Sequence, residues 1–276
     1  MRWKQFFTPV ESMDALQAKK FTDEHKRGSY TLLDVRQPGE YEAGHIPGSK
    51  LIPLPELKER FSEIDPETPT VVYCAIGGRS RVAAQMLAGK NFSRVYNLSG
   101  GFKAWQDNYA VGPEDWGLDL FDGKETPEEV LIVAYSLEKG LRDFYKIMIP
   151  KVRNAKVQEL FRHLFSIELH HQNRIFDEYK KITGDTLAVE QFDRKIVSPA
   201  MEGGLNTEEY IQIYGADIDS EEDVISMAMS IEAQALDMYS RAAENSSNQE
   251  SREILDQIAG EEQAHLKQLG ELFQHL

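Results

Sequence analysis

The sequence is short of cysteine, of positive charge and of long apolar runs, and each shortage excludes a class of protein. It has 1 Cys in 276 residues, so the chain can form neither an internal disulfide nor a Cys-x-x-C metal centre. It has 31 Lys and Arg but 46 Asp and Glu, and the resulting net charge of −15 disfavours nucleic acid and anionic membranes as partners. No apolar run approaches the ~18 residues of a membrane span, and no signal peptide is recognisable at the start. We therefore expect a cytoplasmic protein that binds neither nucleic acid nor membrane.

The first part of the chain, residues 1–106, alternates short apolar strands with helices. This alternation predicts a largely parallel, doubly wound α/β sheet. The strands are expected at residues 30–35, 50–52, 70–73 and 94–98, and the helices at 8–24, 39–44 (as a turn or short helix), 56–63, 80–89 and from residue 100 onward. Sheets of this kind bind ligands at the carboxyl ends of their strands, so a functional site is expected there.

Cys74 directly follows one of these strands and begins a glycine-rich loop that leads into a helix. The loop consists of Cys74, Ala75, Ile76, Gly77, Gly78, Arg79 and Ser80. Backbone N–H groups in such a loop converge on an anion, and the helix N-terminus and Arg79 add positive charge. Because these effects lower the pKa of a thiol, Cys74 is predicted to be a nucleophile assisted by Arg79, with the other loop residues binding substrate through their backbone. The alternative is a buried structural cysteine.

The first part of the chain resembles the single-domain rhodaneses. The matching motifs are Asp34-Val35-Arg36, Glu40-Tyr41 with Gly44-His45-Ile46-Pro47-Gly48, the Cys74–Ser80 loop, and Leu98-Ser99-Gly100-Gly101-Phe102 with Trp105. The resemblance implies a sulfurtransferase that carries a persulfide on Cys74 and uses small sulfur donors and acceptors. Four residues separate Cys74 from Arg79, where the related phosphatases have five, and the shorter loop favours sulfur over phosphate. Asp34 and Arg36 are expected to form a structural ion pair, and His45 to hold its loop.

Residues 107–126 are rich in Asp, Gly and Pro and are predicted to be a linker. Trp116, Leu118 and Phe121 indicate that this linker packs against a domain. Thr126, followed by Pro127 and then Glu129, is typical of a capped helix start. The remaining residues, 127–276, are predicted to be entirely helical, with a long crossover after Gly184.

A Glu-x-x-His pattern occurs twice in this helical part. Glu168 and His171 lie in a long segment, roughly 151–183, that has no internal Pro or Gly. Residues three apart share one face of a helix, so the carboxylate and the imidazole project together. The pattern returns ninety-four residues later as Glu262 and His265, in the last helix.

Two further helices each carry one glutamate followed seven residues later by a tyrosine. The first has Glu138 and Tyr145, and the third has Glu232 and Tyr239, again ninety-four residues apart. Seven residues are almost two helical turns, so each tyrosine lies on the face of its glutamate. The helical part is therefore an internal repeat of two helix pairs.

Four carboxylates and two imidazoles facing one bundle axis cannot all be buried without cations, because each unpaired charge would cost several kcal/mol. A Glu from each of two helices plus Glu-x-x-His from each of the other two is the di-iron or di-manganese carboxylate pattern. The predicted metal ligands are Glu138, Glu168, His171, Glu232, Glu262 and His265. The alternative is solvated surface pairs. Glu261 and His170 are expected to be surface groups, or groups that contact the ligands without binding the metal.

With these motifs the second half resembles the rubrerythrin and ferritin-like family. The resemblance implies a four-helix bundle with two iron ions, although manganese or zinc fits the same ligands. It also implies redox chemistry with peroxide or oxygen, an external electron-donor protein and a homodimer. Tyr145 and Tyr239 are expected to hydrogen-bond the ligand carboxylates. The family usually has a further carboxylate on the third helix, where this chain has Ala235.

Three functions are compatible with these two halves. The first is a persulfide-forming sulfurtransferase (residues 1–106) joined through the linker to a di-iron oxidoreductase (127–276), with a role in oxidative stress. The second is a ferritin-like iron-binding or sensing protein whose rhodanese module is a docking or sulfur-carrier unit. The third is a sulfurtransferase alone, with an empty or zinc-filled bundle.

Overall fold

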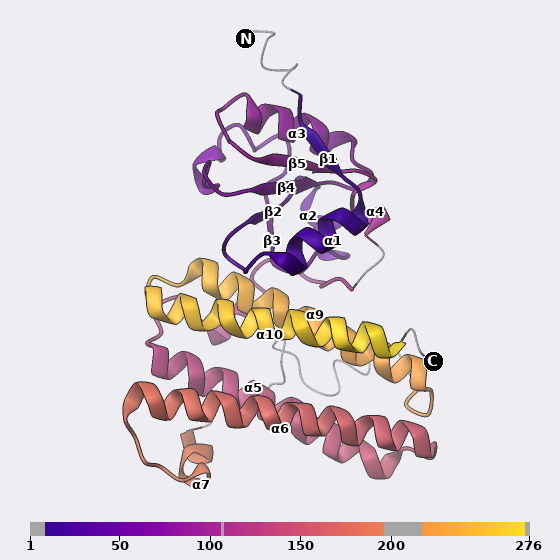
Figure 1. Ribbon diagram of the computed structural model, residues 1–276, viewed down its shortest axis with the longest axis vertical. Coiled ribbons are helices and arrows are strands. Elements are labelled where there is room, and N and C mark those ends of the chain that lie inside the picture. Colours follow the sequence, from indigo (N-terminus) through magenta and orange to yellow (C-terminus); the bar gives the residue numbers. More distant parts are fainter. Residues whose placement is uncertain (1–8, 106–107, 196–216, 274–276) are drawn as a thin grey trace. The chain divides into compact units, whose positions relative to one another are not determined.

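The chain, in this computed structural model, divides into two compact units, residues 1–114 and 115–276. The structure describes residues 9–105, 108–195 and 217–273. The first unit holds a parallel sheet with helices, and the second consists of long helices (Figure 1). The predicted combination of an α/β sheet followed by a helical bundle is confirmed. None of the helices in the described residues has both the length and the apolar composition that a bilayer span requires.

The sheet of the first unit places one buried strand at its centre. Within the described residues its five strands lie in the order β1-β5-β4-β2-β3, and all neighbouring pairs are parallel. These strands are β1 (Glu11–Met13), β2 (Thr31–Asp34), β3 (Ser49–Leu51), β4 (Thr70–Tyr73) and β5 (Val95–Leu98). Every residue of β4 is buried, so Cys74, which follows it, emerges at the middle of the carboxyl edge.

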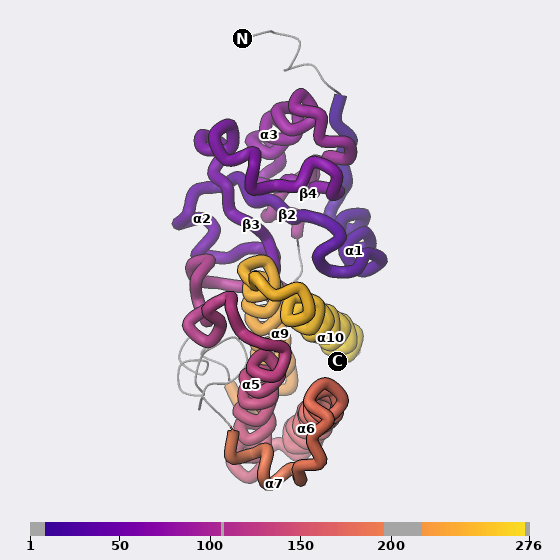
Figure 2. Tube along the Cα trace, turned by 90° about the vertical axis from the view of Figure 1, so that its left-hand side faces the viewer, coloured from indigo at the N-terminus to yellow at the C-terminus, as the bar shows by residue number. Residues whose placement is uncertain are grey.

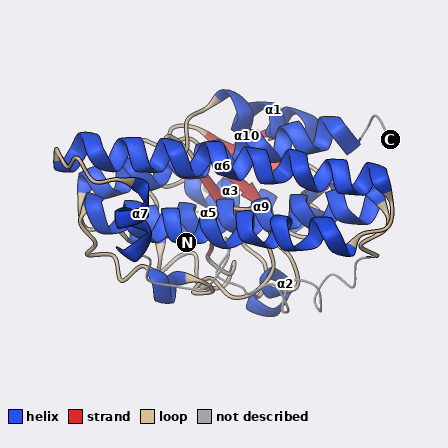
Figure 3. Ribbon diagram, turned by 90° about the horizontal axis from the view of Figure 1, so that it is seen from below, coloured by secondary structure: helices blue, strands red, loops and turns tan. Residues whose placement is uncertain are grey.

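Four helices accompany the strands in the described part of this unit. Figure 3 colours the strands red and the helices, among them α1, α2 and α3, blue. They are α1 (Ala15–Glu24), α2 (Pro38–Glu42), α3 (Gly78–Ala88) and α4 (Gly101–Ala104). The helix predicted over residues 8–24 is wrong in its first part, where residues 11–13 form β1. Asp14 caps the shorter helix, since its side chain accepts a hydrogen bond from the N–H of Gln17 at 2.8 Å.

The helix predicted over residues 56–63 is also wrong. This segment forms turns and a 3-10 helix at Phe61–Glu63. So short a segment does not stabilise an α-helix on its own, and the buried Leu57 reaches the core from a turn.

The second unit is built from two pairs of long helices. One pair is α5 (Pro127–Met148) with α6 (Ala155–Thr183), and the other is α9 (Glu221–Asn245) with α10 (Gln249–Phe273). Most packing contacts lie within the pairs, and Figure 2 shows each pair as two adjacent rods. The predicted cap of the first helix is confirmed: the N–H of Glu129 donates to the Thr126 hydroxyl at 3.3 Å, and the N–H of Thr126 donates to the Glu129 carboxylate at 2.9 Å.

A short helix, α7 (Val189–Phe192), starts the crossover between the two pairs. Phe192 packs on Tyr135, Phe176 and Tyr179, which fastens α7 to α5 and α6. The predicted crossover continues through residues 196–216, which lie outside the described residues.

The bundle core is divided by a polar layer. One apolar cluster takes residues 130–137 of α5 and 235–243 of α9, and a second takes 141–148 of α5 and 224–231 of α9. Glu138 and Glu232 fall between the two clusters on their helices. On α6 and α10 the Glu-x-x-His residues occupy the same intermediate position. The predicted ligands therefore lie in one layer between two apolar clusters.

The segment predicted to be a linker packs partly on each unit. Ala110 exchanges backbone hydrogen bonds with His45 at 2.8 and 3.0 Å, in the first unit. Phe121 belongs to an apolar cluster of the bundle, and the N–H of Ser247 donates to the Gly123 carbonyl at 2.8 Å.

Candidate thiol site and metal centre

Cys74 is buried in a loop that presents hydrogen-bond donors to its sulfur. The N–H of Gly77 lies 3.1 Å from Sγ, and the Ser80 hydroxyl lies 3.4 Å from it. Ser80 is held in place by Asn97 on β5, whose Oδ1 is 2.7 Å from the same hydroxyl. Gly77 has φ 92°, a left-handed conformation that glycine adopts without strain, and this turns the loop around the sulfur.

The turn between β5 and α4 packs against the Cys74 loop and hydrogen-bonds to its backbone. The N–H of Phe102 donates to the Cys74 carbonyl at 2.7 Å. Gly101 permits this contact, because a Cβ there would lie 2.1 Å from the same carbonyl oxygen. The geometry of the thiol loop therefore depends on two distant motifs of the sequence.

The pKa of Cys74 is lowered from its ordinary value. Burial raises it, but hydrogen bonds from the Ser80 hydroxyl and from the backbone of Ser80, Ile76 and Gly77 outweigh that effect. The loop therefore favours the thiolate, which is the nucleophilic form of cysteine.

Arg79 forms an ion pair with Glu40 of α2. Its two terminal nitrogens donate to the two carboxylate oxygens at 2.7 and 2.6 Å. The sequence predicts a role for Arg79 at the thiol alone and none for Glu40. A contact between residues so far apart in the chain leaves no signal in local spacing.

Two structural predictions for this unit are confirmed. Arg36 and Asp34 form a buried ion pair with an N–O distance of 2.6 Å. The Nδ1 of His45 lies 3.0 Å from the Tyr41 carbonyl, and the ring stacks on Tyr41, so His45 holds its loop.

In the bundle, the structure brings the six predicted ligands into one cluster. His171 Nδ1 lies 3.3 Å from Glu138 Oε2 and 3.3 Å from Glu168 Oε2. His265 Nδ1 lies 3.3 Å from Glu262 Oε2 and 3.7 Å from Glu232 Oε2.

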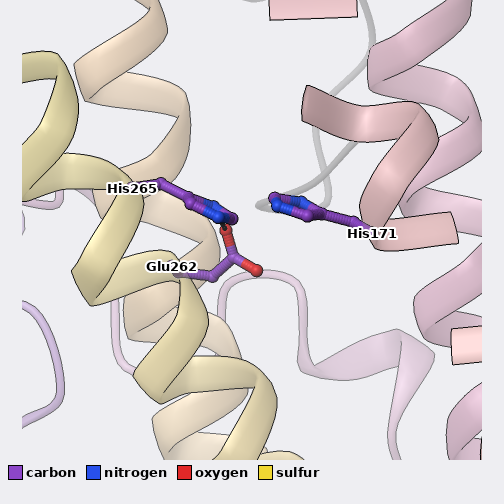
Figure 4. A group of neighbouring side chains, drawn as sticks. All are labelled: His171, Glu262 and His265. Atoms are coloured by element: carbon purple, nitrogen blue, oxygen red, sulfur yellow. Dashed lines mark hydrogen bonds and ion pairs between the residues drawn. The ribbon is translucent and has the colours of Figure 1, made fainter. Parts of the chain in front are cut away.

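The two histidines connect the helix pairs. Their rings are stacked with centroids 3.8 Å apart, and Figure 4 shows His171 facing His265 across the bundle, with Glu262 beside them. Two groups have potential ligand atoms within 4.8 Å of one another. One is Glu138, Glu168 and His171, and the other is His171, Glu262 and His265.

The cluster is deeply buried, and much of its polarity is unsatisfied. All four glutamates are at most 1% exposed. Both oxygens of Glu168 and one each of Glu138 and Glu232 have no hydrogen-bond partner among the described residues. Burial raises the pKa of Glu138 and Glu168 well above the ordinary value. Such groups are costly without cations, and carboxylate and imidazole donors together suit divalent transition metals.

Comparisons with known proteins find two family models in the chain. A rhodanese-like domain model matches residues 17–108, and a rubrerythrin model matches residues 129–276. The chain belongs to the rubrerythrin family, with a rhodanese-like domain preceding the bundle. The predicted fusion is confirmed, and the rubrerythrin domain implies a di-iron site.

Curated relatives and a solved structure resemble parts of the chain. An uncharacterized protein, YqhL of Bacillus subtilis, is 46% identical over 90 residues, which are 32% of this chain and 71% of that protein. The thiosulfate sulfurtransferase GlpE of Pseudomonas entomophila is 37% identical over 78 residues, 28% of this chain and 72% of that protein. A rhodanese-like domain protein from Staphylococcus aureus matches with 26% identity and a TM-score of 0.35, covering 37% of this chain and 98% of that one.

The other residues singled out in the rubrerythrin domain have distinct surroundings. Tyr145 and Tyr239 are fully buried, one in each apolar cluster. Ala235 is buried in the same cluster as Tyr239. Glu261 pairs with Arg174 of α6.

Gln172, next to His171, is a buried residue that the sequence analysis did not identify. Its Oε1 accepts a hydrogen bond from Arg142 of α5 at 2.5 Å, and its amide nitrogen lies 3.5 Å from the Tyr135 carbonyl. It therefore fixes α6 to α5 beside the cluster. A buried glutamine among charged residues gives no sequence signal that separates it from a solvated one.

A cavity of about 290 Å³ reaches the cluster of the rubrerythrin domain. Its walls include Glu232 and His265, together with His163, Leu164, Ile167, Gln268, Leu269, Glu271 and Leu272. A small molecule can therefore approach two of the six candidate ligands between α6 and α10.

Replacing Ser80 with alanine is expected to raise the pKa of Cys74, because the thiolate loses a hydroxyl donor. Thiolate is present above the pKa and lost below it, so at neutral pH alkylation by iodoacetamide slows by up to about tenfold. The measurement is the alkylation rate as a function of pH. Ser93→Ala, an exposed serine beyond α3, is the control and should leave the midpoint unchanged. Equal midpoints for both variants would refute the role of Ser80.

Proposed function

We propose that this protein combines two activities: sulfur transfer through Cys74 and redox chemistry at a di-iron centre in the bundle. The observation that carries the proposal is the polar layer of the bundle, where four buried carboxylates and two facing imidazoles converge with unsatisfied atoms. The donor-lined thiol of the rhodanese-like domain supports the first activity independently.

Sulfur transfer begins with attack of the Cys74 thiolate on a sulfane sulfur. With thiosulfate, the sulfur–sulfur bond of the donor breaks, sulfite leaves with the electron pair, and Cys74 becomes a persulfide anion. The N–H of Gly77 and the hydroxyl of Ser80, which now contact Sγ, are placed to stabilise charge at the outer sulfur. A thiol or cyanide-like acceptor then takes that sulfur and regenerates the thiolate. The likeness to a thiosulfate sulfurtransferase supports this assignment.

In the bundle, Glu138, Glu168, His171, Glu232, Glu262 and His265 would hold two iron ions. Iron held there would supply redox chemistry with peroxide or oxygen, with electrons from a reductant. The protein residues orient the centre, and apolar clusters close the layer on both sides along the bundle. The cavity beside Glu232 and His265 gives a small oxidant its approach.

The proposal also covers the reactants and the partners of the two centres. Small sulfur donors and acceptors serve Cys74, and an external protein supplies electrons to the bundle, because a single cysteine leaves no Cys-x-x-C relay in the chain. We propose a homodimer in the cytoplasm, with a role in oxidative stress.

The test is anaerobic purification of the full chain, followed by metal analysis and an optical spectrum before and after peroxide is added. About two irons per chain, with ferric absorption appearing as peroxide is consumed, is the expected result. Iron that is retained but turns over slowly would favour the iron-binding or sensing alternative. A colourless or zinc-containing protein with normal sulfur transfer would leave the sulfurtransferase as the sole activity.

A further inference from the structure

Glu40 sets the charge that a sulfur donor meets near Cys74. Both terminal nitrogens of Arg79 are bound to its carboxylate, at 2.7 and 2.6 Å. Arg36, the other arginine of the rhodanese motifs, is buried against Asp34. Both guanidinium groups therefore already have a carboxylate partner.

The Glu40–Arg79 ion pair persists at the pH of any sulfur-transfer reaction. Hydrogen bonds from Arg79 lower the pKa of Glu40 to about 2, so the carboxylate stays ionised. Arg79 directly precedes Ser80, whose hydroxyl lies 3.4 Å from the sulfur, so the ion pair adjoins the thiol loop. When a sulfur donor approaches Cys74, the positive charge of Arg79 is therefore already neutralised by Glu40.

Two donors to the sulfur and one exposed side chain of the loop are neutral or apolar. The Gly77 N–H and the Ser80 hydroxyl are dipoles, which suit one developing negative charge better than a dianion. Ile76, within the same loop, is 69% exposed and offers apolar surface at the rim. That surface fits the carbon part of a thiol-derived donor, which thiosulfate lacks.

We infer that Glu40 selects the sulfur donor, so that Cys74 takes sulfur from a low-charge organic persulfide in preference to dianionic thiosulfate. The inference rests on the proposed sulfurtransferase function. The Cys74 thiolate attacks the outer sulfur of R–S–SH, the sulfur–sulfur bond of the donor breaks, and R–S⁻ leaves with the electron pair. Cys74 gains one sulfur and its proton as Cys–S–SH, with no external oxidant or reductant.

The test compares two donors on the same full-length protein. Thiosulfate and cysteine persulfide are each mixed with the reduced chain at low salt, and the gain of one sulfur by Cys74 is followed by intact mass. Glu40→Gln removes the charge but keeps an oxygen that can cap α2, as the Glu40 carboxylate does for the Gln37 N–H at 3.1 Å. Glu42→Gln, an exposed change on the same helix, is the matched control.

The unmodified chain is expected to react at least about tenfold faster with cysteine persulfide than with thiosulfate. Glu40→Gln should raise the thiosulfate rate about tenfold and change the persulfide rate less than about twofold, with the gain shrinking at high salt. Glu42→Gln should alter neither rate. A chain that prefers thiosulfate, or an unchanged donor ratio in Glu40→Gln, overturns the inference. A Cys74 that gains sulfur from neither donor would instead refute the proposed sulfurtransferase.

Discussion

Replacing Cys74 with serine is expected to lower sulfur transfer by at least about 10³-fold, because a hydroxyl at this position is far less nucleophilic than a thiolate. Serine retains the shape of the side chain, so the fold should persist. The measurement is the rate of sulfur transfer from thiosulfate and from a persulfide to a thiol acceptor. The metal content of the bundle, measured on the same sample, should not change.

The result is easy to interpret because the chain has 1 Cys and therefore no second thiol to take over. Cys74→Ala provides an independent variant in which no hydroxyl can interact with the loop. Sulfur transfer that survives in both variants would show that the sulfur is carried by some other group, and the proposed role of Cys74 would be wrong.

Replacing His171 with alanine is expected to abolish stable metal binding, since the ring belongs to both groups of candidate ligands. A ligand that binds only the folded state at about 1,000 times its Kd stabilises it by about 4 kcal/mol, so the bundle should melt about 10 °C lower. Thermal unfolding followed by circular dichroism, together with metal analysis, measures both effects.

The adjacent His170 provides the matched control for this variant. It is exposed, and its Nδ1 lies 2.6 Å from the Ser166 carbonyl on its own helix. His170→Ala should keep the metal and the melting temperature. Glu262→Gln and Glu261→Gln form a second pair with the same contrast, because Glu261 is bound to Arg174. If both members of either pair retain two metals, the assigned ligand set is wrong.

The sequence predicted the features that local spacing determines. Glu168 and His171 share a helical face whatever surrounds them, and the Thr126 cap involves residues within one turn. Because the second helix pair repeats the first, the same spacing also predicted Glu262 and His265. The buried strands were predictable for a similar reason, because a run such as residues 70–73 is apolar throughout.

Features that depend on contacts between distant residues were not predictable. β1 is a short edge strand, and its only signature is its pairing with residues 96–98 of β5. The ion pair of Arg79 with Glu40 and the hydrogen bond of Gln172 with Arg142 likewise join separate elements. Neither residue type nor spacing distinguishes such groups from solvated ones.

The paired arrangement of the long helices has a consequence for the order of folding. Each pair is a helical hairpin with mostly local contacts, and such contacts form fast. Each hairpin carries half of the ligands, one lone Glu and one Glu-x-x-His, so neither hairpin contains a whole site. The complete set of six ligands forms only when the hairpins meet and His171 stacks on His265. Uptake of the second metal thus reports the last step of assembly, while a single ion could bind earlier to Glu138, Glu168 and His171 of the first hairpin.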